Sequence, residues 1–132
     1  MSLSQAEQDE IMAELGAMAD TIKQAYATHD VDLYLSAFDS DAIVSKPNEA
    51  PVRGHNGLRA AFLHRPGLPS GATFEVNPSE FVVMSSDWAY VYGTDTLALA
   101  DGTKETMTFL VLIRKTADGW KTFREVLSAD QP

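Results

Sequence analysis

WAYVYGTDTLALADGTKETMTFLVLIRKTADGWKTFREVL, residues 88–127, is the stretch that decides the fold. It contains runs rich in β-branched and aromatic residues, which favour β-strands. These runs cover residues 88–99, 105–115 and 120–127. Asp101-Gly102 and the TADG sequence at 116–119 separate the runs, and both are typical of tight turns. The stretch therefore predicts three consecutive antiparallel strands.

The first part of the chain has helical periodicity instead. Apolar residues recur at helical spacing between residues 4 and 28, and Ser4 and Glu7 are placed to form a capping box at the helix start. A second, short helix is expected to begin after Asp30 or Asp32, either of which can cap it, and to end near residue 38. A turn is expected at 39–41.

The middle of the chain completes the set of elements. A short strand is predicted at 42–45 and a third helix at 57–64, with Asn56 as its cap. Further strands are expected at 74–76 and 80–84. Three helices followed by an antiparallel meander indicate an α+β fold, in which the helices cover one face of a strongly curved sheet.

Length, charge and cysteine content exclude several classes of protein. The 132 residues are enough for one domain, and all of them are assigned to it here. The absence of cysteine excludes a disulfide framework and a thiolate nucleophile. The net charge of −9 opposes binding to nucleic acid or to an anionic membrane. With no apolar membrane span and a polar, acidic start, a cytoplasmic protein is expected.

Four stretches of the chain resemble the SnoaL-like and ketosteroid-isomerase-like branch of the nuclear-transport-factor-two-like superfamily. They are YATHDVDLYLSAFDSDAIV, PVRGHNGLRAAF, DWAYVYGTDTL and DGWKTFREVLS. The resemblance implies a cone-shaped α+β barrel with a pocket between helices and sheet, and often a dimer through the outer face of the sheet. The family includes isomerases, cyclases, dehydratases, hydrolases and pure binding domains, so the fold leaves the function open.

The catalytic set of the ketosteroid isomerases is missing from this chain. Those enzymes need a base on the strand after the second helix, a tyrosine on the first helix and a protonated aspartic acid on a central strand. In an ungapped alignment these positions fall on Lys46, on Ile22 and on or beside Leu110. The same mechanism is therefore not expected, although Lys46 takes a position that faces the pocket in those relatives.

The alternation of side chains predicts which residues of the last two strands face the pocket. If Lys115 and Trp120 flank the last turn, Leu110 lies opposite Glu125 on the pocket face. That face then also carries Thr106, Thr108, Leu112, Phe123 and Leu127, and the other face carries Met107, Phe109, Val111, Ile113, Trp120, Thr122, Arg124 and Val126. The apolar side chains Phe109, Val111, Ile113 and Trp120 predict a homodimer interface, with burial on both sides of the sheet as the alternative.

Glu125 is the first candidate for chemistry. A lone carboxylate among apolar strand residues needs a partner, a raised pKa or access to water. The candidate partners are Lys46 and Arg124, although Arg124 points the other way if the alternation holds. Lys46 would hold an anionic oxygen while Glu125 acts as acid or base. Asp95 is a second candidate if it opposes Thr108, whereas a slip of one residue would turn Thr94 and Thr96 inward. The alternative is a structural ion pair.

The walls of the pocket are expected to be aromatic and apolar. The candidate substrate-binding residues are Tyr26, Tyr34, Phe38, Phe62, Tyr92 (or Tyr90), Thr108, Leu110 and Phe123. His29, His55 and His64 are not at metal-ligand spacing, and no glycine-rich phosphate loop occurs, so neither a metal nor a cofactor is predicted. Arg53 and Arg59 are expected to pair with acids of the chain such as Asp39 and Asp41.

These observations leave three hypotheses for the function, of which the third is a protein-interaction adaptor, for which no partner motif is visible in the sequence. In the first, the protein binds a small, partly apolar molecule and catalyses cofactor-independent acid/base chemistry on it, by isomerisation, cyclisation, dehydration or hydrolysis. In the second, it is a non-catalytic ligand-binding or dimeric assembly domain. An open pocket beside a positioned carboxyl favours the first hypothesis, and a pocket filled by aromatic side chains favours a structural role.

Overall fold

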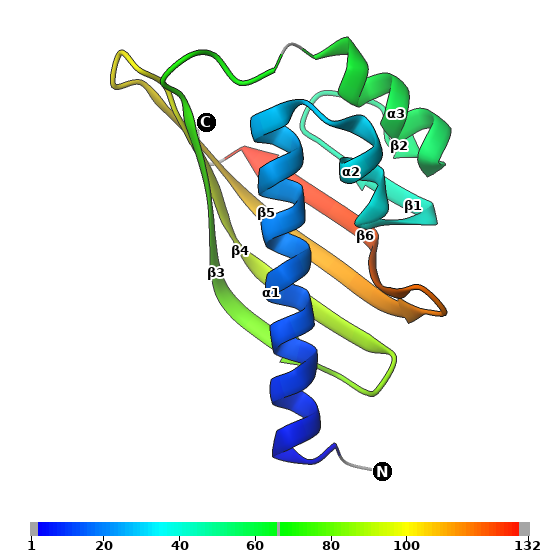
Figure 1. Cartoon of the computed structure of the whole chain (residues 1–132). Helices are drawn as coiled ribbons and strands as arrows, with labels where there is room; N and C mark the ends of the chain where they lie inside the picture. Colours follow the sequence, from blue (N-terminus) through cyan, green and yellow to red (C-terminus); the bar gives the residue numbers. More distant parts are fainter. Residues whose placement is uncertain (1–2, 66, 130–132) are drawn as a thin grey trace.

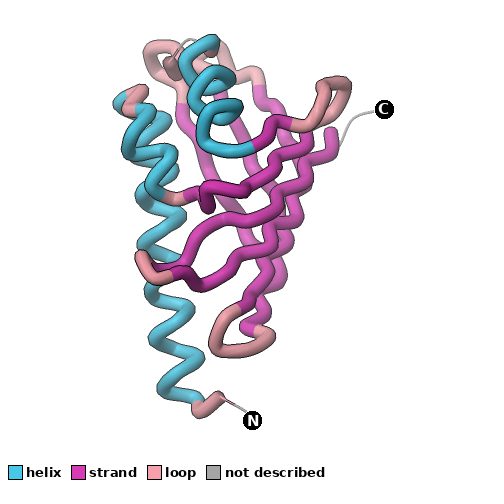
Figure 2. Tube along the Cα trace, turned by 90° about the vertical axis from the view of Figure 1, so that its right-hand side faces the viewer, coloured by secondary structure: helices cyan, strands magenta, loops and turns pink. Residues whose placement is uncertain are grey.

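One strongly curved sheet of six strands wraps around three helices (Figure 1). The computed structural model describes residues 3–65 and 67–129. The strand order is β2-β1-β6-β5-β4-β3, and the helices lie on one side of the sheet (Figure 2). The α+β class predicted from the sequence is confirmed.

Helix α1 (Gln5–Thr28) crosses the sheet and supplies much of the core. The capping box of Ser4 and Glu7 is formed as predicted. Ile11 and Leu15 are buried against Ala89, Ile113 and Trp120 of the sheet. The helix ends at His29, whose left-handed conformation (φ 53°) turns the chain toward the next helix.

The two shorter helices pack near one end of α1. Helix α2 (Val31–Ser36) is capped by the Asp30 side chain, which accepts a hydrogen bond from the Leu33 amide. Helix α3 (Gly54–His64) begins three residues earlier than predicted, so Asn56 lies inside its first turn and the proposed Asn56 cap is wrong. Gly54 has a φ of 67°, a conformation that favours glycine and permits this earlier start.

Strand β1 (Phe38–Ser45) is longer than predicted and includes residues 39–41, which were expected to form a turn. It pairs in parallel with β6 (Gly119–Ala129) and antiparallel with the short β2 (Val52–Arg53). The pairing with β6 is irregular between Phe38 and Ile43. This irregular segment holds Asp39, which is only 4% exposed.

The remaining strands form the predicted meander. They are β3 (Thr73–Val83), β4 (Trp88–Ala98), β5 (Lys104–Thr116) and β6. Strand β3 is a single strand interrupted by an irregularity between Pro78 and Glu80, rather than two strands. The turn between β5 and β6 pairs Lys115 with Trp120, as expected.

A β-bulge at Phe123 reverses the predicted faces of β5. Leu112 pairs with Arg124 and Ile113 pairs with Thr122, so Phe123 has no partner. Because a bulge shifts the register by one residue, Glu125 lies opposite Val111 rather than Leu110. Met107, Phe109, Val111 and Ile113 therefore face inward with Trp120 and Thr122, and Thr106, Thr108, Leu110 and Leu112 face outward.

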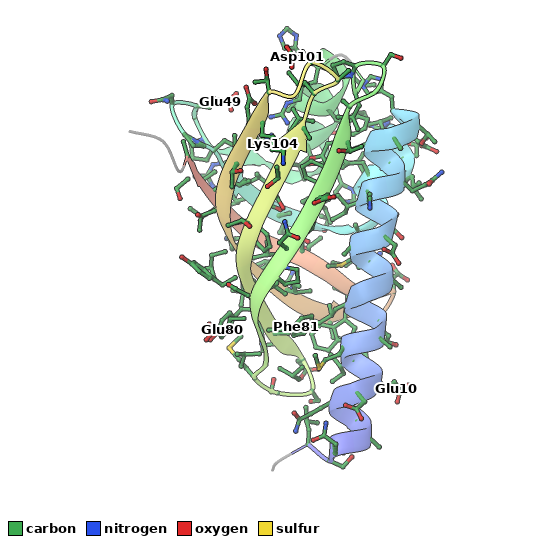
Figure 3. The ribbon with its side chains drawn as sticks, turned by 90° about the vertical axis from the view of Figure 1, so that its left-hand side faces the viewer. Glu10, Glu49, Glu80, Phe81, Asp101 and Lys104 are labelled. Carbon is green, nitrogen blue, oxygen red and sulfur yellow. The ribbon has the colours of Figure 1, made fainter. Side chains whose placement is uncertain are left out.

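The residues predicted for the dimer interface lie in the core instead. Phe109, Ile113 and Trp120 are buried, and Val111 packs against the same cluster. The outer face carries Tyr92, Leu110 and Val126 in one row across three strands, each roughly half exposed. The two faces are also distinct on β3, where Glu80 and Phe81 point to opposite sides of the sheet (Figure 3).

Candidate functional site

A cavity of about 620 Å³, called the outer compartment here, lies between the helices and the sheet. Its walls come from α1, α2, α3, the loops that follow β1 and α3, and strands β3, β4, β5 and β6. Exposed residues of the loops, such as Asn48 and Gly67, form part of the wall, so the compartment opens to solvent at that end. Its volume lies within the ~300–1,000 Å³ typical of small-molecule sites.

A second cavity of about 170 Å³, the inner compartment, adjoins the first. Its walls are mainly apolar and include Leu15, Met18, Ile22, Phe109, Val111 and Ile113. The buried hydroxyl of Thr122 also lines it and has no hydrogen-bond partner in residues 3–65 and 67–129. Both compartments are lined by Tyr26, Phe74, Asp95 and Glu125, which therefore lie where the two meet.

Glu125 reaches this junction from the middle of β6. No hydrogen bond or ion pair with another described residue involves its carboxyl group. Burial, together with the nearby charge of Asp95, raises the pKa of Glu125 to about 7 against the opposing effect of Arg65. At neutral pH the group therefore exists in both protonation states, which suits an acid or base.

Asp95 also faces the junction, by a different register from the one predicted. It lies opposite Met107 rather than Thr108, and Thr94 and Thr96 point outward. Asp95 nevertheless faces inward as expected, because two differences cancel. Its partner on β5 is shifted by one residue, and the inward face of β5 is also shifted by one residue. Burial raises the pKa of Asp95 to about 6. The two carboxyl groups come from strands on either side of β5.

Four aromatic rings form one wall of the outer compartment. The ring of Tyr26 lies 5.6 Å from that of Tyr34, 5.9 Å from Phe62 and 5.2 Å from Phe74. Burial, together with the charge of Glu125, raises the pKa of Tyr26 to about 12. Burial also raises the pKa of Tyr34. Both phenols therefore stay protonated at neutral pH and can donate hydrogen bonds.

The cation that acts on Glu125 is not the one that the sequence predicted. Lys46 lines the outer compartment, but it forms no ion pair with Glu125. The cation that acts on Glu125 is Arg65, which follows α3 and lines the same compartment. Neither Lys46 nor Arg65 pairs with a carboxylate among the described residues. Sequence analysis missed Arg65 because it lies in a Pro/Gly-rich loop, where no periodicity assigns a facing.

The predicted wall residues divide into two groups. Tyr26, Tyr34 and Phe62 line the outer compartment, and Phe38 lines the inner one. Tyr92, Thr108, Leu110 and Phe123 lie on the outer side of the sheet, so their assignment to the pocket is wrong. The bulge is the cause for the last three residues, since it shifts the register between β5 and β6.

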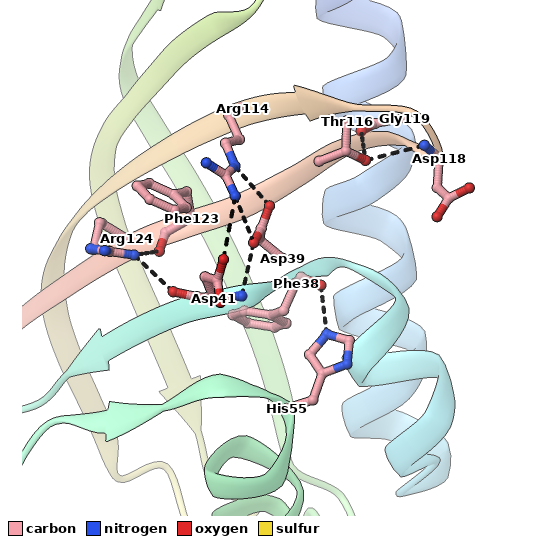
Figure 4. A network of polar contacts seen from close by, with 10 residues as sticks. All are labelled: Phe38, Asp39, Asp41, His55, Arg114, Thr116, Asp118, Gly119, Phe123 and Arg124. Carbon is pink, nitrogen blue, oxygen red and sulfur yellow. Dashed lines mark hydrogen bonds and ion pairs between the residues drawn. The ribbon is translucent and has the colours of Figure 1, made fainter.

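A polar network lies beside the bulge (Figure 4), and its members Asp39, Arg114 and Arg124 line neither compartment. Arg114 donates to both carboxylate oxygens of Asp39, at 2.8 and 3.1 Å, and this contact holds the pKa of Asp39 below its usual range. The guanidinium groups of Arg114 and Arg124 lie 4.1 and 3.8 Å from the centre of the Phe123 ring. The network thus holds Phe123 on the outer side of β6.

The other predicted polar contacts are also different or limited in scope. Arg59 pairs with Asp32 at 3.1 Å, not with Asp39 or Asp41. His29 stacks on Phe62, and His55 contacts the carbonyl oxygen of Phe38 at 2.8 Å. Within residues 3–65 and 67–129, no group of three His, Asp or Glu side chains could hold a metal ion. In the same part of the chain, no helix is long and apolar enough to cross a membrane.

A curved sheet wrapped around a long helix, with a cavity between them, defines the nuclear-transport-factor-two-like class, also called cystatin-like. The family model of the SnoaL-like domain matches residues 19–123. The chain therefore belongs to the SnoaL-like domain family, which supports a small-molecule-binding domain. No protein of curated function matches the sequence.

Solved structures with the same fold are numerous. A ketosteroid isomerase-like protein from Erwinia carotovora atroseptica is 25% identical, with a TM-score of 0.72 over 91% of this chain and 96% of that one. A protein of this class with a cystatin-like fold from Novosphingobium aromaticivorans has a TM-score of 0.83 at 16% identity, over 96% and 86% of the two chains. One from Shewanella oneidensis MR-1 has a TM-score of 0.76 at 20% identity, over 89% and 98%.

Proposed function

We propose that the two compartments bind a small, partly apolar molecule and that Glu125 transfers a proton to or from it. The observation that carries this proposal is the position of Glu125, a carboxyl group without an internal partner at the junction of two cavities. A buried carboxyl that serves only stability is normally hydrogen-bonded or paired. Glu125 instead has free space beside it and is available to a ligand.

The neighbouring groups suit cofactor-independent acid/base chemistry. Asp95 raises the pKa of Glu125 and so keeps its proton available near pH 7. The protonated Tyr26 lines both compartments and can donate a hydrogen bond to a carbonyl oxygen of the ligand. Lys46 and Arg65 add positive charge where negative charge develops on the bound molecule. Isomerisation, cyclisation, dehydration and hydrolysis all use such a set of groups.

The test follows proton exchange and does not require the natural substrate. Small ketones, enones, phenols and aromatic acids are first screened by thermal shift, and each hit is then incubated with the protein in D₂O. We expect wild type to accelerate deuterium incorporation next to a carbonyl group of a hit, and Glu125→Gln to reduce that rate about 100-fold or more. Glu10→Gln, on the exposed side of α1, is the matched control.

The assay separates the first two hypotheses. If ligands bind and shift the melting temperature but no exchange is catalysed, the protein is a binding module and the acid/base proposal fails. If exchange occurs equally with wild type and Glu125→Gln, Glu125 is not the acid or base. The exchange rate with Glu125→Asp, which keeps a carboxyl group on a shorter side chain, reports how strictly the position matters.

We further propose a homodimer through the outer face of the sheet, with different residues from those first expected. The row of Tyr92, Leu110 and Val126 supports it, because three roughly half-exposed apolar side chains adjoin across neighbouring strands. Sedimentation equilibrium should give twice the chain mass for wild type and the single mass for Leu110→Glu. A monomeric wild type at micromolar concentration would contradict the proposal.

A further inference from the structure

The cations of the outer compartment form no ion pair with a described residue, although the charge of Arg65 acts on Glu125. Arg59, Arg114 and Arg124 each contact an acidic side chain or a carbonyl group, whereas Arg65 and Lys46 pair with no described carboxylate. Both line the outer compartment, so two of the ten basic residues of an acidic chain surround one cavity. Positive charge held in a ligand cavity without a protein partner is suited to an anionic ligand.

The inner compartment has the opposite character. Its walls are mainly aliphatic and aromatic side chains from α1, β1, β3, β4 and β5, and its polar side chains are those of Asp95, Thr122 and Glu125. Its volume of about 170 Å³ is close to that of an apolar cavity of roughly 150 Å³ known to bind benzene. One aromatic ring or a compact branched alkyl group therefore fits this space. A ligand that fills both compartments must have a charged end and an apolar end.

We infer that the ligand is an arylalkanoic acid or a similarly compact apolar monocarboxylic acid, with its carboxylate at Arg65 and Lys46 and its ring in the inner compartment. This inference rests on the proposed function, since it specifies the molecule that lies beside Glu125. The planar guanidinium of Arg65 matches a carboxylate in charge and geometry. A phosphate dianion is disfavoured because Glu49, Asp95, Glu105 and Glu125 line the same compartment.

Binding of such an acid should take up a proton near pH 7. Arg65 lowers the pKa of Glu125 in the free protein, and an anion paired with Arg65 cancels this effect. The ligand charge also raises the pKa of Glu125 and of Asp95 directly. Of the other groups that face the outer compartment, Tyr26 and Tyr34 stay protonated, and Lys46, Glu49, Glu105 and His29 complete the set. Affinity for the acid should therefore fall as pH rises through about 7.

Calorimetry with a matched pair of probes tests the inference. 3-Phenylpropionate and 3-phenylpropan-1-ol share the ring and the chain length, and only the first is an anion. At pH 7 we expect the acid to bind at least about tenfold more tightly, and Arg65→Gln to remove that preference. Arg59→Gln, on α3 and paired on the surface with Asp32, should keep it. Titration in phosphate and in Tris buffer measures the proton uptake.

Three results are decisive. Equal affinity for acid and alcohol, or an unchanged preference in a folded Arg65→Gln, overturns the inference while leaving ligand binding and the deuterium-exchange test of Glu125 intact. Where Arg65→Gln fails to fold, Lys46→Gln serves as the second variant, and an unchanged preference there has the same meaning. If neither probe binds to wild type at millimolar concentration, the inference is overturned, and the exchange assay with other hits decides the proposed function separately.

Discussion

Asp39 and Glu125 are both largely buried carboxyl groups on neighbouring, parallel strands, and their surroundings give them opposite properties. Arg114 grips both oxygens of Asp39 and holds its pKa low, so the group is a fixed anion. Glu125 has no such partner, and burial raises its pKa to about 7. Burial alone therefore does not reveal the role of a carboxyl group, whereas the presence or absence of a partner does.

The two sites also depend on each other through the bulge. Arg114 contacts Asp39 and lies over the Phe123 ring at the same time. Phe123 is the extra residue of β6, and its outward position is what turns Glu125 inward. The paired carboxyl thus supports the geometry that leaves the other one unpaired.

The largest expected effect comes from breaking the paired site. Asp39→Asn should destabilise the protein by about 2–4 kcal/mol, because Arg114 loses a bidentate, charge-assisted partner. In wild type this stabilisation is present above the unfolded pKa of about 3.9 and is lost as pH falls through the lower folded value. Urea denaturation at pH 7 measures the loss. Asp41→Asn is the control, since Asp41 is exposed and 3.9 Å from Arg114.

Removing the carboxyl group of Glu125 should change the unfolding free energy in the opposite direction, as a gain in stability. Folded Glu125 holds its proton up to about pH 7, against a usual value of 4.5, so wild type loses stability as pH rises between these values. Glu125→Gln should gain on wild type across that window, by about 1–3 kcal/mol at pH 8 relative to pH 4. Denaturation curves of both proteins at several pH values measure the difference. A difference independent of pH would mean that folding leaves the pKa of Glu125 unchanged, and a dependence of the opposite sign would mean that Glu125 is paired in solution.

A smaller effect is expected when the charge next to Glu125 is removed. Asp95→Asn removes a negative charge that raises the pKa of Glu125, so that pKa should fall, by up to about one unit. A carbon-detected NMR titration of the Glu125 carboxyl group measures the shift. Glu75→Gln, at an exposed position on β3, serves as the control. No shift in Asp95→Asn would show that burial alone sets the pKa.

The smallest effect is expected for an ion pair that resembles the pair of Asp39 and Arg114 in its distance but not in its burial. Arg59 and Asp32 are 3.1 Å apart, but their side chains are 46% and 81% exposed. Arg59→Gln should change the unfolding free energy by less than about 0.5 kcal/mol, because solvent screens the charges. The same urea experiment checks this. A loss of unfolding free energy comparable to that of Asp39→Asn would contradict the argument that burial makes the pair of Asp39 and Arg114 the more stabilising one.

Local signals in the sequence predicted the elements of the fold well. The Ser4 and Glu7 capping box, the Asp30 cap and the Lys115 and Trp120 pairing depend on neighbouring residues, and all three were found. The faces of β5 were wrong because the alternation rule assumes an unbroken ladder. A bulge depends on packing across strands, here on Arg114 and Arg124, which both contact the Phe123 ring. No pattern within the sequence of β6 predicts it.

The site was predictable to a similar extent. Glu125 stood out because a carboxylate among apolar strand residues conflicts with its surroundings. Arg65 could not be found in this way, since its place beside Glu125 results from how the end of α3 packs over the sheet. The partner of Asp39 lies 75 residues away on another strand, so only the tertiary structure identifies it.

The unpaired residue of β6, Phe123, has a consequence for how this chain is compared with its relatives. Inward residues of this strand are spaced by two up to Thr122 and by three from there to Glu125. Losing a single codon at Phe123 would remove the extra residue and leave an unbroken ladder, in which Arg124 still pairs with Leu112 and Glu125 still faces the cavity. A lineage could thereby lose the bulge without exchanging its cavity residues, and relatives of this chain should be compared by strand pairing rather than by sequence column.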